Sequence, residues 1–497
     1  MRFMQYVITS TLPKEFAGRT KSLLNRTKNL NEKANIPYTI ISTNYNPNYN
    51  EVYDHYYKSG YISKEVKLMN VYDYLSKRTY MKDSVAHEKN EFGLMKFEMK
   101  KDEIYRYFDN GKYVLYKNYE NPNNQLKFID VMDTGNRKRK SRKEFNHNGI
   151  CHKEIIYTQG TTNILEEIFY DEDGIAYLNK TYNGSKENKL IRIYYFNSNE
   201  VMHFDNEKVF FSYCLSKIIE KDSTVICDAR LLDRPLIELK VPNVKKIFVF
   251  HNSHLNANDV LDVKLSYQYI IDNYDLLDYI VVLTEQQKED LRNLIDVEKK
   301  VKVIPHSIKL NNIKDVKNNT ENKLVSVGRL VEHKQIDHLI EAYQLNRDKL
   351  IDFTIEIYGT GDQKQKLEQL INHYQLQEKI MLMGSTNEPE KVFSTAKASF
   401  LVSKFEGFGL VIMESINSGC PVVAYDIKYG PRDLISPEIN GLVIEQDNIQ
   451  ALSDAMVQVV NMDFKEVTPD NRFSDEHFID NWSFLDPKKK SNFFSKI

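Results

Sequence analysis

Residues Phe405 to Asp426 read FEGFGLVIMESINSGCPVVAYD, and this stretch is the main indication of the fold and the ligand site of the C-terminal half. Two acids, Glu406 and Glu414, flank a Gly-Phe-Gly tripeptide and an apolar run, and a β-rich run closes the stretch. Glycines at a helix start let backbone N–H groups approach an anion closely, and the positive helix end favours a phosphate. The stretch therefore indicates a loop and helix for a ligand with a hydroxyl-rich ring and a phosphate. The alternative is that both acids are ordinary solvated residues at a helix end.

Other strand ends in this half carry the same kinds of residue. A buried strand near Lys323 runs into Arg329 and Lys334, a second runs into Gly-Thr-Gly at 359–361, and a third ends at Gly384. The ends of parallel strands share one sheet edge, where open α/β sheets bind their ligands. A planar arginine and a compact lysine five residues apart across a strand-to-helix turn converge on one anion. The pattern predicts a nucleotide-type site in the C-terminal half.

The N-terminal segment predicts the opening of a doubly wound α/β domain. Residues 4–9 have the character of a buried strand, a glycine-containing loop and a helical pattern follow, and residues 37–42 form a second strand. We interpret Gly18 as a position where the backbone lies close to a ligand rather than as a simple turn. The GxGxxG dinucleotide signature is missing from this loop, which disfavours a nicotinamide cofactor.

Residues 61–205 break this rhythm and predict an inserted antiparallel β-meander. Segments rich in Tyr, Phe and Ile are joined by two-residue turn signals that supply positive φ. The signals are Asn110-Gly111, Asn148-Gly149, Asp173-Gly174 and Asn183-Gly184. The many tyrosines suit a sheet face covered by another subunit or by an acceptor, although a merely decorated sheet is the simpler alternative. The basic run RKRKSRK at 137–143 is interpreted as a solvated hairpin tip, with contact to a polyanion as the alternative.

The alternation of strands and helices resumes near Lys208. It predicts strands that end at VICDAR, KKIFVFHNSHL, YIVVL and VKVIPHSI. Thr284 is the expected N-cap of the helix after the third of these strands. His251 and His254 follow a strongly apolar strand. A histidine in such a place is often a plain loop residue, and His251 is the better candidate of the two for contact with a ligand or acceptor.

The length, charge and cysteine spacing of the chain exclude several classes of protein. The chain has 497 residues, so two or three domains are expected. A formal net charge of -2 gives no overall field for nucleic acid. No apolar run approaches the ~20 residues of a membrane span, and the N-terminus lacks the pattern of a signal peptide. The four cysteines have no CxxC spacing, which predicts reduced thiols in a cytoplasmic protein and no zinc site.

These segments together resemble the retaining glycosyltransferases of family four, which have the GT-B fold of two Rossmann-like domains. The resemblance covers residues 323–445 in family order, and FSDEHFIDNW at 473–482 resembles the family's closing helix. Its motifs are VSVGRLVEHKQIDHLIEA, IYGTGDQKQKL, LMGS, FEGFGLVIMESINSGCPVVAYD and NGLVIE. The AGRTKS loop, the inserted sheet and FHNSHL look like the bacterial subgroup that glycosylates wall teichoic acid or serine-rich surface proteins. The family often has two adjacent glycines in the first loop, whereas Ala17 precedes Gly18 here.

The resemblance implies transfer of a hexose, glucose or GlcNAc, from a UDP-sugar with retention at the anomeric carbon. The implied catalytic residues are Arg329, Lys334, Glu406 and His251, with His254 as a possible acceptor contact. The implied donor-binding residues are Gly18, Arg329, Lys334, Met383, Gly384, Gly407, Phe408, Gly409, Leu410, Val411 and Glu414. The two cations would neutralise the leaving diphosphate, so neither a metal nor another cofactor is expected. No nucleophile is assigned.

The predicted fold class is α/β: a GT-B fold with an antiparallel β-sheet insertion in its N-terminal domain. Residues 1–60 and 206–312 would form an acceptor domain, 61–205 the insertion, 313–470 the nucleotide-sugar domain, and 471–497 a helix returning to the first domain. In the teichoic acid enzymes the inserted sheet mediates homotrimer assembly, so a homo-oligomer is expected, at the inner face of the membrane or free in the cytoplasm.

Three functions compete. The first is a glycosyltransferase acting on the polyol-phosphate chain of wall teichoic acid. The second moves GlcNAc from UDP-GlcNAc to Ser or Thr of serine-rich surface proteins, and the third is an inactive sugar-binding partner subunit. Such partners tend to lose the Arg, Lys and Glu of the donor site, which this chain retains. A glycosidase would need two acids across the bond, and acids eight residues apart around a helix start do not offer such a pair.

Overall fold

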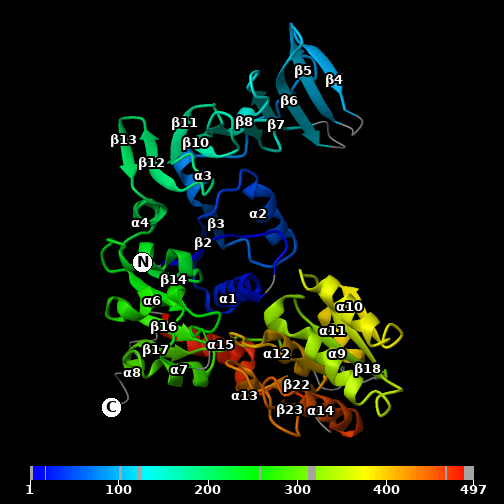
Figure 1. The fold of residues 1–497 in the computed structure, drawn as a ribbon. Helices are drawn as coiled ribbons and strands as arrows, with labels where there is room; N and C mark the ends of the chain where they lie inside the picture. Colours follow the sequence, from blue (N-terminus) through cyan, green and yellow to red (C-terminus); the bar gives the residue numbers. More distant parts are fainter. Residues whose placement is uncertain are drawn as a thin grey trace. The chain divides into compact units, whose positions relative to one another are not determined.

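The computed structural model describes residues 4–16, 18–99, 103–120, 125–256, 259–311, 321–464 and 467–485. The chain forms two compact units, whose helices and strands are coloured along the sequence in Figure 1. The first comprises Met1–Phe16 and Pro37–Lys245, and the second comprises Ala17–Ile36 and Lys246–Ile497. Predicted features on Ala17, residues 313–320 and residues 486–497 lie outside the described residues. Within the described ranges, no helix combines the length and apolarity needed to cross a membrane.

The first unit contains a parallel sheet in the order β14-β1-β2-β3. Its strands are β1 Gln5–Thr9, β2 Tyr38–Ser42, β3 Lys67–Asn70 and β14 Thr224–Cys227. Its helices are α2 Tyr49–Lys58, α3 Val71–Ser76, α4 Glu207–Ile218 and α5 Asp233–Ile237, with the 3-10 turn η1 at Arg230–Leu232. Every residue of β1, β2 and β14 is buried, as expected for strands inside a parallel sheet, and this includes polar side chains such as Gln5 and Thr39. The strands predicted at 4–9 and 37–42 are confirmed.

A ten-stranded antiparallel sheet completes the first unit, with its strands in chain order from β4 to β13. Its strands are β4 Met95–Glu98, β5 Ile104–Asp109, β6 Lys112–Glu120, β7 Gln125–Met132, β8 Arg139–Phe145, β9 Cys151–Tyr157, β10 Ile164–Tyr170, β11 Ala176–Tyr182, β12 Leu190–Asn197 and β13 Glu200–Phe204. The turn between β5 and β6 has Asn110 at φ 45° and Gly111 at φ 78°, the conformation that its dipeptide predicted. The predicted β-meander is confirmed.

The basic run at 137–143 is not a hairpin tip, so that interpretation is wrong. Only its first two residues precede β8, whose strand pairs with β7 and β9 on its two sides. Arg142 makes two hydrogen bonds, of 2.7 and 2.9 Å, with the buried carboxylate of Asp130. Its guanidinium also lies 3.7 Å from the centre of the Phe128 ring. The charges of this run are therefore partly neutralised inside the sheet, which the sequence alone did not reveal.

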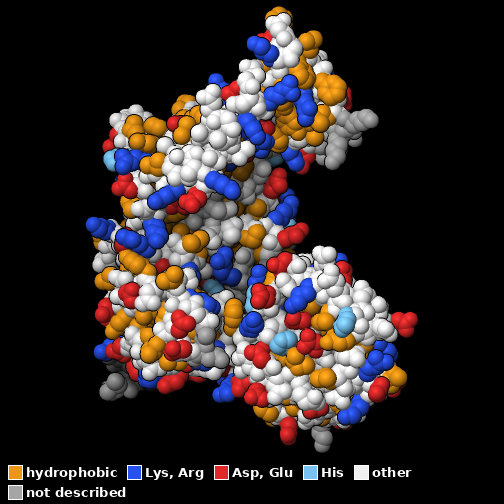
Figure 2. Space-filling model, in the orientation of Figure 1, with side chains coloured by type: hydrophobic (Ala, Val, Ile, Leu, Met, Phe, Trp, Pro, Cys, Tyr) orange, Lys and Arg blue, Asp and Glu red, His pale blue; other side chains and the backbone are white. Residues whose placement is uncertain are grey.

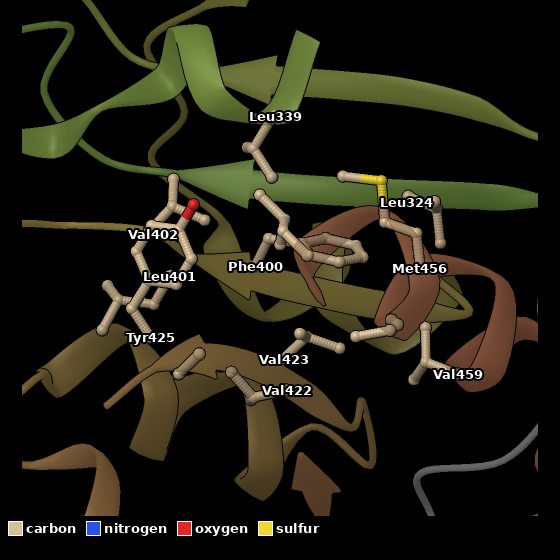
Figure 3. Packing of buried hydrophobic residues seen from close by; sticks show 14 of the residues in the cluster. Leu324, Leu339, Phe400, Leu401, Val402, Val422, Val423, Tyr425, Met456 and Val459 are labelled. Carbon is tan, nitrogen blue, oxygen red and sulfur yellow. The ribbon is translucent and has the colours of Figure 1, made fainter. Parts of the chain in front are cut away.

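The second unit is built on a six-stranded parallel sheet in the order β20-β19-β18-β21-β22-β23. Its strands are β18 Lys323–Val327, β19 Thr354–Tyr358, β20 Ile380–Gly384, β21 Ala398–Leu401, β22 Val422–Tyr425 and β23 Gly441–Ile444. Its helices are α9 Ile336–Leu345, α10 Lys364–His373, α11 Pro389–Thr395, α12 Leu410–Asn417, α13 Pro431–Leu434 and α14 Ile449–Asn461, with the 3-10 turn η4 at Glu332–Lys334. Figure 3 shows the core, in which Leu339 of α9 and Met456 of α14 pack with Phe400 and Val423 of the sheet.

The second unit also holds helix α1 and a parallel array of three strands. The strands are β15 Lys245–Val249, β16 Tyr279–Val282 and β17 Val301–Val303. The helices are α1 Gly18–Ala34, α6 Leu265–Asp272, α7 Glu285–Leu291, α8 Val297–Lys300 and α15 Asp475–Trp482, and the 3-10 turns are η2 Tyr274–Leu276, η5 Asn471–Phe473 and η6 Ser483–Leu485. Thr284 caps α7 as predicted, because its hydroxyl accepts from the Gln287 N–H at 3.1 Å. The domain boundaries were predicted from the order of strands and helices along the chain, and they remain predictions.

Candidate active site

The six-stranded sheet of the second unit has a topological switch point between β18 and β21. The chain proceeds from β18 outward through β19 and β20, and then returns to the other side of β18 as β21. Ligands of open α/β sheets bind where the strand order reverses, beyond the carboxyl ends of the strands. Arg329 and Lys334 follow β18, and Glu406 follows β21. The fold therefore brings together the two cations and the acid that the sequence placed in one site.

Lys334 and Glu406 form a tight ion pair across this switch point. The Ser403 hydroxyl donates to the same carboxylate oxygen at 2.9 Å, so the acid is held from two directions. The side chains of Lys334 and Glu406 are 16% and 17% exposed. Arg329 is exposed, and its guanidinium makes no hydrogen bond or ion pair with any residue that the structure describes. A fork of donors at a strand end, left open in this way, is suited to a bidentate contact with a phosphate.

The Gly-Phe-Gly loop depends on glycine for close backbone contact. A Cβ atom on Gly407 would lie 2.0 Å from the His251 backbone oxygen, a distance that no side chain tolerates. Gly430 adopts φ 114°, and a Cβ there would lie 1.8 Å from the Phe408 backbone oxygen. Gly409 adopts φ 84° immediately before α12 begins. The loop is thus fixed by backbone packing, with the N-terminus of α12 directly behind it.

His251 lies in a stack of rings next to this loop. Its ring is nearly parallel to that of His306, with centroids 5.8 Å apart, and His306 meets the edge of Phe408 at 5.2 Å. The Ser22 hydroxyl lies 3.3 Å from Nε2 of His306. The Phe408 side chain is 3% exposed and belongs to the core, so only its backbone is available to a ligand. The sequence did not single out His306, although its place after the VKVIP strand is the same signal that identified His251.

Glu414 on α12 forms an ion pair with Lys21 in the first turns of α1. The distance from Nζ to Oε1 is 2.6 Å, and the side chains are 53% exposed for Lys21 and 14% for Glu414. Gly18 opens α1, and a Cβ added there would meet no atom within 4 Å. The start of α1 therefore lies beside α12. Sequence reasoning missed Lys21 because the pair joins residues 393 positions apart.

The remaining donor-site candidates line strand or helix ends without charged contacts. Leu410 and Val411 open α12 and are half-buried against the core. Met383 is 46% exposed at the end of β20. Gly384 follows with φ 79°, and its carbonyl accepts from the Gly359 N–H at 2.7 Å. These positions offer apolar surface and backbone groups, as a base or a sugar ring would need.

His254 does not reach an open surface. It is fully buried, its ring is parallel to Tyr429 with centroids 6.2 Å apart, and burial lowers its pKa to about 4. The Tyr429 hydroxyl in turn donates to Asp290 at 2.6 Å. The geometry favours a packing role for His254 beneath the loop rather than the predicted contact with an acceptor.

Two basic side chains that the sequence did not single out, Lys264 and His333, lie against the Phe405 ring. The Lys264 ammonium lies 4.5 Å from its ring centre, and His333 stacks on it at 5.2 Å and 11°. Burial lowers the pKa of Lys264, and burial followed by the charge of Lys334 lowers the pKa of His333. In the part of the chain that the structure describes, no group of three or more His, Cys, Asp or Glu residues is placed to hold a metal ion.

Comparison with known proteins agrees with this geometry. Residues 308–474 match the family model described as glycosyl transferases group 1. A poly(ribitol-phosphate) alpha-N-acetylglucosaminyltransferase from Staphylococcus aureus is 31% identical over 94% of this chain and 96% of its own length. The chain belongs to the group 1 glycosyltransferases. A second relative of this glycosyltransferase, a poly(glycerol-phosphate) alpha-glucosyltransferase from Bacillus subtilis, is 28% identical and covers 96% of this chain and 74% of the relative.

Solved structures confirm the predicted fold of the glycosyltransferase. The crystal structure of TarM matches 98% of this chain and 99% of its own with a TM-score of 0.86 at 28% identity. A mutant of Staphylococcus aureus TarM in complex with fondaparinux, alpha-GlcNAc-glycerol and UDP gives 0.85 over 97% and 99% at the same identity. The glycosyltransferase therefore has the GT-B fold with an antiparallel sheet inserted in its N-terminal half, as predicted.

Proposed function

We propose that this glycosyltransferase transfers glucose or GlcNAc from a UDP-sugar, with retention, to a hydroxyl of a polyol-phosphate polymer of the wall teichoic acid type. One observation supports the proposal: Lys334 pairs with Glu406 across the switch point of the second unit, and Arg329, which follows the same strand as Lys334, adds a second positive charge near His333. The names of the two relatives, one acting on a ribitol-phosphate and one on a glycerol-phosphate polymer, support the acceptor class.

The proposed roles follow from charge and position. Arg329 and Lys334 bind the diphosphate, Glu406 holds the sugar hydroxyls, and Glu414 accepts from the ribose hydroxyls. The bond from the anomeric carbon to the phosphate oxygen breaks while the bond to the acceptor oxygen forms on the same face. The acceptor proton passes to the leaving phosphate, and UDP departs. The two cations stabilise the charge that develops on the diphosphate, a task that a metal performs in other enzymes.

We also propose that the reaction requires no metal ion or other cofactor. Arg329 and Lys334 already place two positive charges at the switch point, so a divalent cation would compete with them for the same oxygens. Transfer measured with and without EDTA, and after addition of Mg²⁺ or Mn²⁺, tests this point. Equal rates are expected, and loss of transfer on chelation with recovery on adding metal would contradict it.

Labelled UDP-glucose and UDP-GlcNAc, each offered with poly(glycerol phosphate), poly(ribitol phosphate) and a serine-rich peptide, test the acceptor. Label in a polymer is expected. Label in the peptide alone would establish the alternative, a protein O-GlcNAc transferase. Binding of UDP without transfer to any of the three would support the inactive partner subunit.

We propose that the inserted sheet assembles the protein as a homotrimer. β4 ends the sheet and pairs only with β5 among the described residues. Met95 and Phe97 on this edge strand are 62% and 57% exposed, and Figure 2 shows hydrophobic side chains gathered at this end of the insertion. An exposed apolar edge strand is suited to pairing with another chain. Light scattering should give a trimer for the protein and a monomer for Phe97→Glu, and a monomeric unaltered protein would refute the assembly.

We place the protein in the cytoplasm, working at the inner face of the membrane or free of it. All four cysteines are free thiols, as expected in a reducing compartment. Fractionation of cells should recover the protein in the cytoplasmic fraction or in a salt-removable membrane fraction. Recovery outside the cell would contradict this placement.

A further inference from the structure

The first unit contains a cavity of about 760 Å³ that shares no lining residue with the donor site. It opens at the carboxyl ends of the parallel strands: Ser10 follows β1, Thr43 and Asn44 follow β2, and Arg234 lies beyond β14. Other lining residues come from β9 to β12 of the inserted sheet and from the start of α4. The volume lies within the range of about 300–1,000 Å³ for ligand sites, and the carboxyl edge is where such sheets bind ligands.

The lining of this cavity holds more basic than acidic side chains. Four cations line it, and only two acids, Glu167 and Glu207, stand among them. Both acids are already engaged. Glu207 pairs with Lys180 at 2.7 Å, while Glu167 accepts from the Tyr182 hydroxyl at 2.5 Å and lies 3.6 Å from Lys153. Lys153 also pairs with Glu144 at 2.9 Å, and Arg234 pairs with Glu238 at 2.7 Å, so Lys208 is the cation of this lining without an ion-pair partner among the described residues.

Two of the lining cations, Lys208 and Arg234, are exposed to solvent, whereas Lys153 and Lys180 are largely buried. Lys208 is exposed in the first turn of α4, and its ammonium has no hydrogen-bond or ion-pair partner among the described residues. Arg234 is 49% exposed and keeps part of its guanidinium in solvent beside Glu238. Two exposed cations, one at a helix start and one on a short helix, can each contact a phosphate without first breaking a buried pair.

Four aromatic side chains also line the cavity, Tyr45, Tyr72, Phe169 and Phe211. The buried Lys180 ammonium lies 5.6 Å from the ring centre of Tyr72 and 5.9 Å from that of Phe169. Burial opposes its charge, but Tyr72 and Glu207 outweigh burial and raise the pKa of Lys180, so it stays protonated. Tyr72 and Phe169 are each 2% exposed, so the half-buried rings of Tyr45 and Phe211 offer the aromatic surface that suits the C–H groups of a polyol.

We propose that this cavity binds a segment of an anionic polyol-phosphate chain, with its phosphates at Lys208 and Arg234 and a polyol unit against Tyr45 and Phe211. The inference rests on the proposed acceptor class. It assigns residues of the inserted sheet and of α4 to binding of that acceptor. A chain that occupies this cavity is held by the first unit while the second unit holds the donor. A concave site of this size fits a chain segment better than the flat surface of a bilayer.

The test compares Lys208→Glu/Arg234→Glu with a matched control, Lys58→Glu/Lys217→Glu. The control also reverses two exposed charges of the first unit, one of them on α4, but neither residue lines the cavity. Binding of poly(glycerol phosphate) is measured by calorimetry at low salt, and thermal unfolding reports whether each variant folds. The cavity variant should bind at least about tenfold more weakly, and the control should bind like the unaltered protein. Should the double variant fail to fold, Lys208→Glu alone should weaken binding in the same direction.

Three outcomes overturn the inference. Equal polymer binding by the cavity variant and the unaltered protein removes the site, and so does an equal loss in the control, which would indicate only general charge. Loss of binding to phosphatidylglycerol vesicles without loss of polymer binding would assign the cavity to a membrane. If the unaltered protein transfers sugar to the polymer in these cases, the proposed function survives, whereas absence of both transfer and binding in the unaltered protein would end both.

Discussion

The backbone oxygen of His251 occupies the space where Gly407 would carry a side chain, 2.0 Å from the position of a Cβ atom. This contact joins the loop after β21 to the loop after β15 within the second unit. Glu406, one residue earlier, is held by Lys334 and Ser403. The packing at Gly407 therefore sets where the Glu406 carboxylate lies relative to the switch point.

Gly407→Ala should both destabilise the protein and reduce transfer. The added methyl group would overlap backbone atoms, which cannot rotate away, so a loss of at least about 2 kcal/mol in unfolding free energy is expected. Gly18→Ala is the control for stability, because a Cβ there meets no atom within 4 Å. Thermal unfolding of both variants gives the comparison, and equal melting temperatures would show that the close contact is not maintained in solution.

Lys334→Ala and Glu406→Ala should each abolish measurable transfer while leaving the fold intact. Removal of a preorganised charge from a transition-state site costs about 10²–10³ in rate. Both side chains are largely buried, so removing one leaves the other charge unpaired and lowers stability, and thermal unfolding must show that each variant is still folded. Steady-state kcat/KM with the UDP-sugar measures the effect. Lys391→Ala, an exposed lysine on α11, should keep full activity, and full activity in either of the first two variants would remove that residue from the mechanism.

Glu414→Ala should weaken UDP binding and erase the preference for a ribose. A hydrogen bond to a charged group contributes about 1.5–3 kcal/mol, so the variant should bind UDP about tenfold more weakly or worse. The unaltered protein should bind UDP more tightly than 2′-deoxy-UDP, and the variant should bind the two alike. Calorimetric titration with both nucleotides settles the point, and a preserved preference in the variant would place the ribose elsewhere.

The protein should lose stability as the pH falls from about 6.5 toward 4, in part because of His254. Burial lowers the pKa of His254 from 6.5 to about 4, so the unfolded chain binds a proton that the folded chain refuses in this window. Stability therefore rises with pH between these values. His254→Gln should reduce the loss between pH 7 and pH 5 by about 2 kcal/mol. Denaturant unfolding at both pH values measures this, and an unchanged pH dependence would mean that His254 titrates normally.

The sequence predicted the charged part of the site because strand topology, not side-chain detail, brings it together. Arg329, Lys334 and Glu406 each follow an apolar strand, and parallel strand ends share an edge whatever the packing. The pair of Lys21 and Glu414 could not be predicted, because no local pattern indicates which helices lie side by side. The sequence also does not show which side chains are buried. His254 therefore resembled His251 in the sequence, but its side chain lies fully inside the protein.

The fold was predicted best where patterns were long and local. Alternating strands with Asn-Gly and Asp-Gly turns specified the inserted sheet, since those dipeptides demand positive φ. The basic run at 137–143 failed because charge suggested solvent, whereas Asp130 and Phe128 from a neighbouring strand accommodate Arg142. Such compensation depends on register between strands, which composition does not reveal.

Transfer of labelled sugar to poly(glycerol phosphate) and poly(ribitol phosphate) by the unaltered protein and by Arg329→Ala tests the central claim most directly. Arg329 is the one cation of the site without a partner among the described residues, so its removal breaks no internal contact there. We predict that the unaltered protein labels a polymer and that Arg329→Ala loses about 10²–10³ in kcat/KM while its melting temperature is unchanged. Full transfer by Arg329→Ala, or label that appears in neither polymer, would contradict the account.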